Sequence, residues 1–311
     1  MKRIIGLLSL SILLTAAFSN NASAQYYFYN DDYYDNPLIF EAGISLGAMN
    51  SLTDIGGNKG IGKRFVKDLN LGQTSVCGGV FLNLMYKNAA AIRLEGTFGK
   101  VSGNDNVLEK VSPLDIAKTR YNRNLNFRSN ITEFSLMLEL HPLFIFINYE
   151  ERESDPPKLS PYLLGGVGYF SFNPQANLNG RWVDLQPLST EGQGLKGYEG
   201  TKPYKLQQIN FPLGLGLKYE LSPLLNLRGE YVYRVLNTDY LDDVSTNYVD
   251  PTAYALSGFT GTKLQNALDL SDRQIVPSTG PGGKRGSPKQ KDAYFSFNLK
   301  LSLNIGREKI R

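Results

Sequence analysis

Three carboxylates fall within five positions of the segment TDYLDDVSTNY, at Asp239, Asp242 and Asp243. Carboxylate, amide and hydroxyl oxygens are the ligands that calcium prefers. The spacing differs from that of an EF-hand loop, which needs acids at alternating positions, a central glycine and a later glutamate. Aspartate, asparagine and serine also bond their own backbone in turns. We therefore expect the three aspartates to order a loop by accepting bonds from backbone N–H groups and nearby basic side chains; a calcium site is the alternative.

Other residues that could carry catalysis are few. The chain has one histidine, His141, and one cysteine, Cys77, so a disulfide within the chain is impossible. Glu133 and Glu139 could act as an acid pair, but six residues along a strand separate them by about 20 Å. The glycine-rich segment after Trp182 follows no strand–loop–helix pattern and is no phosphate loop. We expect no enzyme activity, no cofactor, no metal ligand set and no small-molecule substrate.

The N-terminus predicts export. Met1-Lys2-Arg3 precedes an apolar run to Phe18 and a small-x-small site, Ala22-Ser23-Ala24, which together are typical of a secretory signal peptide. We expect residues 1–24 to be removed between Ala24 and Gln25, which lowers the formal charge from +4 to +2. That balance disfavours a nucleic-acid partner. Residues 25–37 are then an N-terminal tail, 38–306 a β-barrel and 307–311 a periplasmic tail.

Period-two alternation of apolar and polar residues recurs through the rest of the chain. In YFSFNLKLSLNIG, the apolar residues Phe295 to Ile305 alternate with Ser296, Asn298, Lys300 and their polar successors. Successive side chains of a strand point to opposite faces, so such a strand has one apolar and one polar face. The pattern predicts eight strands near residues 38–49, 74–87, 89–101, 126–141, 159–172, 205–221, 223–236 and 293–306.

The connections between these strands alternate in length. Tight turns are expected at Lys87-Asn88 and Ser222-Pro223, whereas residues 50–73, 102–125, 173–204 and 237–292 form long connections. Short periplasmic turns and long external loops around an even number of antiparallel strands are typical of an outer-membrane β-barrel. His141 then falls at the periplasmic end of its strand, away from the outer rim where barrel enzymes that modify lipid act.

The polar faces carry charges of both signs. A soluble sandwich or lipocalin-like barrel would turn these charges to solvent and fill its interior with the apolar face. An eight-stranded barrel leaves an interior that side chains just fill, so the charges could instead pair inside while the apolar face meets lipid. We favour this second arrangement, with a lumen charge network that comprises Glu41, Arg93, Glu95, Glu133, Glu139, Lys218, Arg228, Glu230, Arg234 and Lys300.

Aromatic residues near strand ends suggest membrane-interface girdles. We expect Phe170 and Phe172 at the outer girdle and Tyr219 at the inner one. Trp182 is expected to anchor an ordered external loop by packing. The Gly/Pro/Lys-rich segment 278–292 is expected to be a flexible basic loop tip.

Specific segments resemble a known family. They are GAMNSLTDIGG (Gly47–Gly57), GIGKRFVKDLN (Gly60–Asn70), NFRSNITEFSLMLE (Asn126–Glu139), PYLLGGVGYFSFNPQA (Pro161–Ala176), WVDLQPLSTEGQG (Trp182–Gly194), NTDYLDDVSTNYVD (Asn237–Asp250), LSDR (Leu270–Arg273) and RGSPKQKDAYFSF (Arg285–Phe297). With them the chain resembles, from about Gly43 to Gly306, the PorG-like outer-membrane barrel family of Bacteroidetes, one of whose members is the barrel component of the type IX secretion system.

The resemblance implies a non-enzymatic barrel in the bacterial outer membrane. Its partners would be outer-membrane lipid and the periplasmic ring proteins of the secretion complex, and some relatives support gliding motility. The alternative is an adhesin-like or lipid-modifying barrel that works through its external loops. The two differ in where partners bind: at the periplasmic side, including NYEERESDPPK and the tail REKIR, or at the external loops.

Overall fold

The computed structural model describes residues 37–57, 71–112, 114–147 and 157–305. All of them belong to the second of two compact units, Asn36–Arg311. The expected signal peptide, its cleavage site at Ala24 and Gln25, the tail up to residue 36, most of NYEERESDPPK and the tail 307–311 lie outside the described residues.

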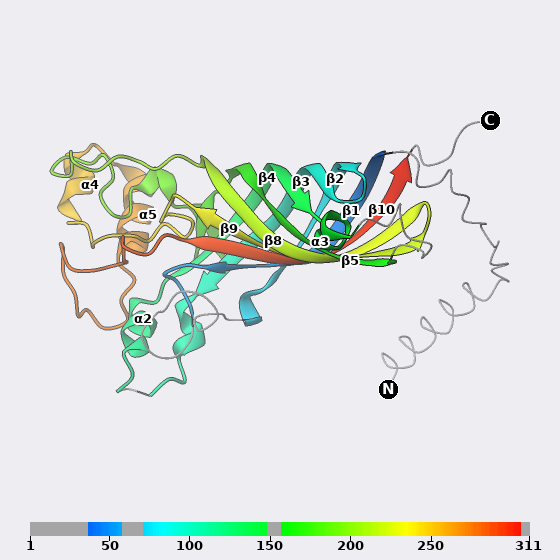
Figure 1. Ribbon diagram of the computed structural model, residues 1–311. Helices are drawn as coiled ribbons and strands as arrows, with labels where there is room; N and C mark the ends of the chain where they lie inside the picture. Colours follow the sequence, from blue (N-terminus) through cyan, green and yellow to red (C-terminus); the bar gives the residue numbers. More distant parts are fainter. Residues whose placement is uncertain (1–36, 58–70, 113, 148–156, 306–311) are drawn as a thin grey trace, which may run out of the picture. The chain divides into compact units, whose positions relative to one another are not determined.

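Eight strands close into an antiparallel barrel (Figure 1). They are β1 (Leu38–Leu52), β2 (Ser75–Tyr86), β3 (Ala90–Asn104), β4 (Asn126–Leu140), β5 (Leu159–Ser171), β8 (Gln207–Ser222), β9 (Leu225–Leu236) and β10 (Ala293–Ile305). Each strand pairs with its neighbours in chain order, and β10 pairs with β1 to close the circle. The expected fold class, an eight-stranded antiparallel barrel, is confirmed.

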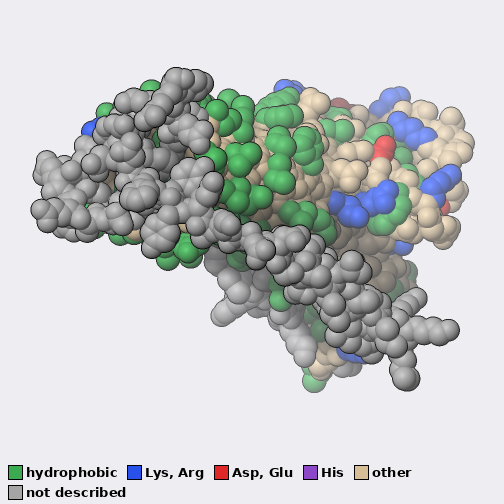
Figure 2. All heavy atoms as spheres, turned by 90° about the vertical axis from the view of Figure 1, so that its right-hand side faces the viewer, with side chains coloured by type: hydrophobic (Ala, Val, Ile, Leu, Met, Phe, Trp, Pro, Cys, Tyr) green, Lys and Arg blue, Asp and Glu red, His purple; other side chains and the backbone are tan. Residues whose placement is uncertain are grey.

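The two faces of the strands lie in different environments. In β10, Leu299 is 66% exposed while its neighbour Lys300 is fully buried. The same alternation runs through β9, where Arg228 and Glu230 are buried between exposed positions. Figure 2 shows hydrophobic side chains gathered on the part of the barrel wall that this view leaves uncovered. The polar face therefore lines the lumen, and the apolar face forms the outer wall, as transmembrane barrels require.

Short connections lie at one end of the barrel, which we call the turn end. The β2–β3 turn has positive φ at both Lys87 (49°) and Asn88 (56°), and the amide of Ala89 donates to the carbonyl of Tyr86 at 2.9 Å. Two left-handed residues define the type I′ turn, whose twist suits a tight hairpin. The β8–β9 turn comprises Pro223 and Leu224, because Ser222 still belongs to β8. Helix α3 (Pro142–Phe146) follows β4 at this end.

Long connections gather at the opposite end, the loop end, and contain structure that the alternation did not predict (Figure 1). The elements are η3 (Leu71–Gln73), η4 (Asp105–Leu108), α2 (Ala117–Arg123), β6 (Pro174–Leu178), β7 (Arg181–Asp184), η5 (Gln186–Leu188), α4 (Thr252–Leu256) and α5 (Gly261–Ser271). The β6–β7 hairpin extends the sheet from β4. No helix among the described residues is long and apolar enough to cross a membrane.

The placement of Phe170 and Phe172 at an outer girdle was wrong. Both are buried, and their rings lie 5.4 Å apart in a stack that continues through Tyr204 (6.1 Å from Phe172) to Tyr240 (4.7 Å further). Phe170 shares the inward face of β5 with Tyr162 and Leu164, so alternation directs its ring into the lumen. We call Phe170, Phe172, Tyr204, Tyr240 and Tyr294 the aromatic stack; it fills the lumen at the loop end. Tyr219 is exposed on the outer wall.

Candidate functional site

The lumen holds all ten charged side chains that the alternating pattern assigned to the polar face. Each is buried, and five glutamates face five basic residues: Glu41, Glu95, Glu133, Glu139 and Glu230 with Arg93, Lys218, Arg228, Arg234 and Lys300. We call this set the lumen network. Because the opposite charges are equal in number, the network is neutral without counter-ions from solvent.

Every cation of the lumen network contacts at least one of its glutamates. The contacts join Arg93 to Glu95 (3.3 Å), Glu139 and Glu230 (2.5 Å), Arg228 to Glu41 and Glu139 (2.9 Å), Lys300 to Glu95 (2.6 Å) and Glu230 (2.7 Å), Arg234 to Glu133 (3.3 Å), and Lys218 to Glu41 (3.4 Å). Shared partners join eight of these residues into one system from strand to strand, and Arg234 and Glu133 form a separate pair. Removing one partner of a buried pair costs about 3–5 kcal/mol, so these contacts fix the interior.

Two aromatic rings complete the centre of the lumen. Phe81 lies under three cations, with Arg93, Arg228 and Lys300 at 5.2, 5.8 and 5.1 Å from its ring centre. A Cβ on Gly43 would lie only 2.5 Å from this ring, so glycine makes room for it. The hydroxyl of Tyr162 donates to Glu230 at 2.7 Å. The sequence reasoning missed both rings.

Ser160, His141 and Glu139, at the turn end, are in contact in the sequence serine–histidine–carboxylate that a nucleophilic triad has. His141 Nδ1 lies 2.9 Å from Ser160 Oγ, and its Nε2 lies 3.4 Å from Glu139. A serine nucleophile, however, needs access to its substrate and a carboxylate devoted to orienting the histidine. All three residues are buried, the ring of Tyr162 stacks on the imidazole, and Glu139 is also bound by Arg228. The geometry therefore supports a structural contact between β4 and β5.

The three aspartates of the opening segment lie buried where the long loops meet. Asp242 accepts hydrogen bonds from the amides of Ile55 (2.9 Å) and Val244 (3.0 Å). Asp243 accepts from the hydroxyls of Tyr204 (2.6 Å) and Thr190. Asp242 therefore ties the β9–β10 loop to the β1–β2 loop, and Asp243 ties it to the β7–β8 connection.

Asp239 and the backbone of Asp243 complete this part of the loops. Asp239 accepts from the hydroxyl of Ser245 at 2.8 Å, not from a backbone amide as expected. Asp243 has a left-handed backbone (φ 66°), which aspartate tolerates better than most residues. All three aspartates thus order the loops from the inside, as acceptors of hydrogen bonds.

Two buried arginines connect the same loops. Arg123, at the end of α2, binds Asp105 through Nε at 3.0 Å and donates to the carbonyls of Asp54 (2.6 Å) and Arg285 (2.9 Å). Arg285 donates to Glu191 at 3.0 Å and to the carbonyl of Asp243 at 2.8 Å.

Glu191 in turn accepts from the amides of Ser245 (3.0 Å) and Thr246 (2.8 Å). We call Asp105, Arg123, Glu191, Asp242, Asp243 and Arg285 the cap cluster, because it joins the four long connections over the lumen. Within the segment 278–292, expected to be a flexible basic tip, Arg285 and Asp292 are buried and bonded to other segments, whereas Lys284, Lys289 and Lys291 are exposed.

Burial shifts the pKa values of the loop carboxyls upward. It raises the pKa of Asp239 to about 7 and that of Asp243 to about 6. The pKa values of Asp242 and Asp292 lie well above the ordinary value for the same reason, and nearby carboxyls raise them further. Burial therefore favours the protonated form of these acids.

A calcium site finds no support among the residues that the structure describes, because no group of three or more His, Cys, Asp or Glu side chains is arranged to hold a metal ion there.

Trp182 lies in β7, where the guanidinium of Arg128 stacks 4.1 Å from its ring centre. Arg128 also bonds Gln175 of β6, so this stack holds the β6–β7 hairpin against β4.

Four of the eight segments quoted for the family resemblance meet at the cap cluster or contact it. Asp54 and Ile55 come from GAMNSLTDIGG, Glu191 from WVDLQPLSTEGQG, Asp242 from NTDYLDDVSTNYVD, and Arg285 from RGSPKQKDAYFSF. Four segments far apart in the chain thus meet through the hydrogen bonds described above. Arg123 and Asp105, which the sequence reasoning missed, carry no local signal of their own beyond charge in a long connection.

Solved structures with similar folds include bacterial outer-membrane proteins. Ail, the attachment invasion locus protein of Yersinia pestis, is 10% identical, with 86% of this chain and 99% of that chain covered and a TM-score of 0.35. Neisserial surface protein A is 8% identical (85% and 96% covered, TM-score 0.35). OprG from Pseudomonas aeruginosa is 11% identical (86% and 95% covered, TM-score 0.33). Nothing about function follows from similarity at this level.

Sequence comparison gives a family. A search of curated proteins found no match. The model of a family described as "Domain of unknown function (DUF6089)" matches residues 28–248, which is more than half of the chain and ends inside the β9–β10 loop. The chain therefore belongs to the DUF6089 family.

Proposed function

We propose that this chain is a non-enzymatic structural barrel of the bacterial outer membrane that presents its ends to other proteins. The observation that carries the proposal is a lumen filled along its length. The lumen network occupies the middle, the aromatic stack lies above it, and the cap cluster joins the loops beyond the stack. In the described part of the chain these side chains pair with one another inside the barrel, which favours a structural role over conduction or catalysis in the lumen.

The outer wall supports the membrane location. Large apolar side chains on all eight strands are exposed, including Ile44 (62%), Leu82 (60%) and Leu299 (66%). Exposing so much apolar surface to water is unfavourable, whereas hydrocarbon accepts it. A closed barrel also satisfies its backbone groups without water, which a membrane span requires. The loop end then faces the exterior and the turn end the periplasm, because long loops of such barrels are external.

The finer proposal is a docking role in type IX protein secretion, and gliding in organisms that glide. It is supported by the resemblance to the PorG-like family, four of whose quoted segments meet at or contact the cap cluster. A docking barrel needs a rigid scaffold, and the buried ion pairs of the lumen and cap would supply one. Periplasmic ring proteins would contact the turn end.

Site-specific photo-crosslinking in the native bacterium tests this role. A photoreactive residue would replace Leu224 at the turn end, Lys202 at the loop end, or Leu213 on the outer wall as a control; all three are exposed. We expect Leu224 to give an adduct with a periplasmic component of the secretion machine and Leu213 to give none. In parallel, deletion of the gene should remove proteins from the culture medium. An unchanged set of secreted proteins, or protein adducts from Lys202 alone, would contradict the docking role.

A surface-acting barrel is the second candidate. The observation in its favour is the cap, since four long connections joined by buried hydrogen bonds and by the Arg285–Glu191 ion pair make a preorganised binding surface. The crosslinking experiment separates the two candidates, because this one places the partner at Lys202. A lipid-modifying activity has less support, because the Ser160–His141–Glu139 contact is buried at the turn end.

A further inference from the structure

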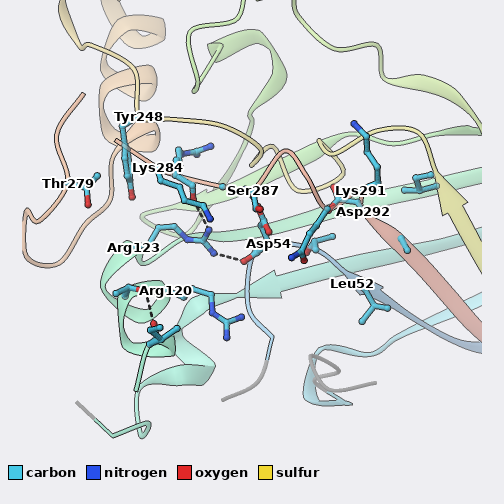
Figure 3. Close-up of a pocket in the computed structure, with 18 of the residues that line it drawn as sticks. Leu52, Asp54, Arg120, Arg123, Tyr248, Thr279, Lys284, Ser287, Lys291 and Asp292 are labelled. Atoms are coloured by element: carbon cyan, nitrogen blue, oxygen red, sulfur yellow. Dashed lines mark hydrogen bonds between the residues drawn. The ribbon is translucent and has the colours of Figure 1, made fainter. Parts of the chain in front are cut away.

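A pocket of about 710 Å³ opens beside the cap cluster. Its walls come from the end of β1, from α2, from the loop-end part of β9 and from the segment between α5 and β10. Figure 3 shows Arg120 and Arg123 of α2 on one side of it and Lys284 and Ser287 on another, with Asp54 close to Arg123. Arg123, Arg285 and Asp54, which line it, also make the cap contacts described above.

The pocket is strongly basic. Arg120, Arg123, Lys284, Arg285 and Lys291 line it against only two acids, Asp54 and Asp292. Arg123 and Arg285 are neutralised within the cap cluster. The ammonium groups of Lys284 and Lys291 are exposed and make no ion pair with any residue that the structure describes.

Both acids that line the pocket accept hydrogen bonds from backbone amides of the chain. Asp54 accepts from the amide of Ser287 at 2.6 Å, and Asp292 accepts from the amide of Leu241 at 2.8 Å. Burial and neighbouring carboxyls raise the pKa of Asp292 well above its ordinary value, which favours its neutral form. Lys284 lies near Asp54 and Lys291 near Asp239 without forming an ion pair, so basic residues still outnumber acids in the pocket lining. Arg120, also in the lining, donates to the carbonyl of Gly56 at 3.0 Å.

Part of the pocket lining is apolar. Tyr233 and Val235 line it from the outward face of β9, the face that continues down the barrel as apolar wall. Ile116, just before α2, lines it as well and is 59% exposed. A pocket lined both by cations and by apolar residues from the upper rim of the barrel wall matches an amphiphile with an anionic head.

We propose that this pocket binds the phosphate group of a membrane amphiphile in the outer leaflet. The phosphate oxygens accept from Lys284 and Lys291, and an acyl chain lies along Tyr233 and Val235. Lysine binds phosphate as a compact charge with three donors, and two lysines suit a headgroup that carries a full negative charge. The inference rests on the membrane location proposed above but not on the secretion role.

Binding can be measured on the detergent-solubilised barrel without any partner protein. The purified protein in a neutral maltoside detergent is titrated with dihexanoyl phosphatidic acid, with dihexanoyl phosphatidylcholine and with inorganic phosphate. The test variant is Lys284→Gln/Lys291→Gln. The matched control is Lys196→Gln/Lys202→Gln, which removes the same charge from exposed lysines that do not line the pocket. A further variant, Ile116→Gln, changes only the apolar wall.

We expect phosphatidic acid to bind at least tenfold more tightly than phosphatidylcholine. The Lys284/Lys291 variant should lose at least tenfold in affinity for phosphatidic acid, and the control variant should lose less than twofold. Ile116→Gln should weaken phosphatidic acid but not inorganic phosphate. Equal binding of the two lipids, or full affinity in the Lys284/Lys291 variant, would overturn the proposal. Inorganic phosphate that binds as tightly as phosphatidic acid would show a free-anion site and would overturn the assignment to a membrane amphiphile.

Discussion

Replacing Arg228 by methionine should destabilise the barrel more than any change on its surface. Arg228 is fully buried and contacts both Glu41 and Glu139, while the ring of Phe81 lies 5.8 Å away. Methionine has a similar reach but no charge. The variant leaves two buried carboxylates without their shared cation, so the lumen network gains an uncompensated negative charge.

The magnitude follows from the contacts that remain. Loss of one partner of a buried pair costs about 3–5 kcal/mol. Glu41 keeps hydrogen bonds from Asn83 (2.9 Å) and Asn226 (2.7 Å) and the contact with Lys218 (3.4 Å), which favours the lower end of that range. A loss of about 3 kcal/mol corresponds to a fall in Tm of roughly 6–12 °C for a domain of this size.

The assay is thermal unfolding in detergent, followed by the mobility shift between folded and heated barrel in a gel. Arg181→Met is the matched control, since Arg181 is exposed in the β6–β7 hairpin, and surface changes cost within about 0.5 kcal/mol. The double variant Arg228→Met/Glu139→Gln should recover part of the loss, because it removes one of the stranded charges. Equal Tm values for Arg228→Met and Arg181→Met would refute the argument that the lumen network holds the barrel together.

Three further outcomes follow from the cap and the turn end. Asp242→Ala leaves the amides of Ile55 and Val244 without their acceptor, so it should weaken the cap locally by about 1–3 kcal/mol, seen as faster hydrogen exchange at those amides than in the parent. The folded-state pKa values of Asp239 (about 7) and Asp243 (about 6) exceed the ordinary 3.8, so the stability that their protonated forms contribute is fully present below pH 3.8 and is lost as pH rises through 6 to 7. Hydrogen exchange, corrected for its intrinsic rate, should therefore show more protection of residues 238–248 at pH 5 than at pH 8. More protection at pH 8 would contradict this prediction. A fluorophosphonate probe should not label Ser160, and labelling that disappears in Ser160→Ala would reopen the enzyme question.

The strands could be predicted because each strand separates two environments, lipid on one face and a charged lumen on the other. A side chain that faces lipid and one that faces a charged lumen differ in polarity, so period-two alternation in β9 and β10 is nearly complete and gives strand ends within a few residues. The lumen charges follow from the same pattern. The inward position of Phe81 could not be predicted in this way. It shares the inward face of β2 with Asn83, but its outward neighbours are apolar too, so polarity does not alternate there.

The loops were less predictable because distant residues determine them. The aspartates could be assigned a loop-ordering role from residue type alone, but their partners Ile55, Thr190 and Tyr204 lie far away in sequence. Helix α5 begins with glycine after Thr260, whose side chain makes no cap bond, so its start carried little local signal. Its core residues Ala267 and Leu270 pack against Tyr254 and Leu188, which only the folded loops bring together.

The claim of a filled, non-conducting barrel is tested most directly by ion conductance across a planar lipid bilayer. The purified barrel would be inserted at low protein density and the current recorded over a range of voltages, with a known open porin as positive control. With the lumen network, the aromatic stack and the cap cluster in place, we predict insertion without steady single-channel currents. Reproducible open-channel currents from the folded barrel would contradict the account.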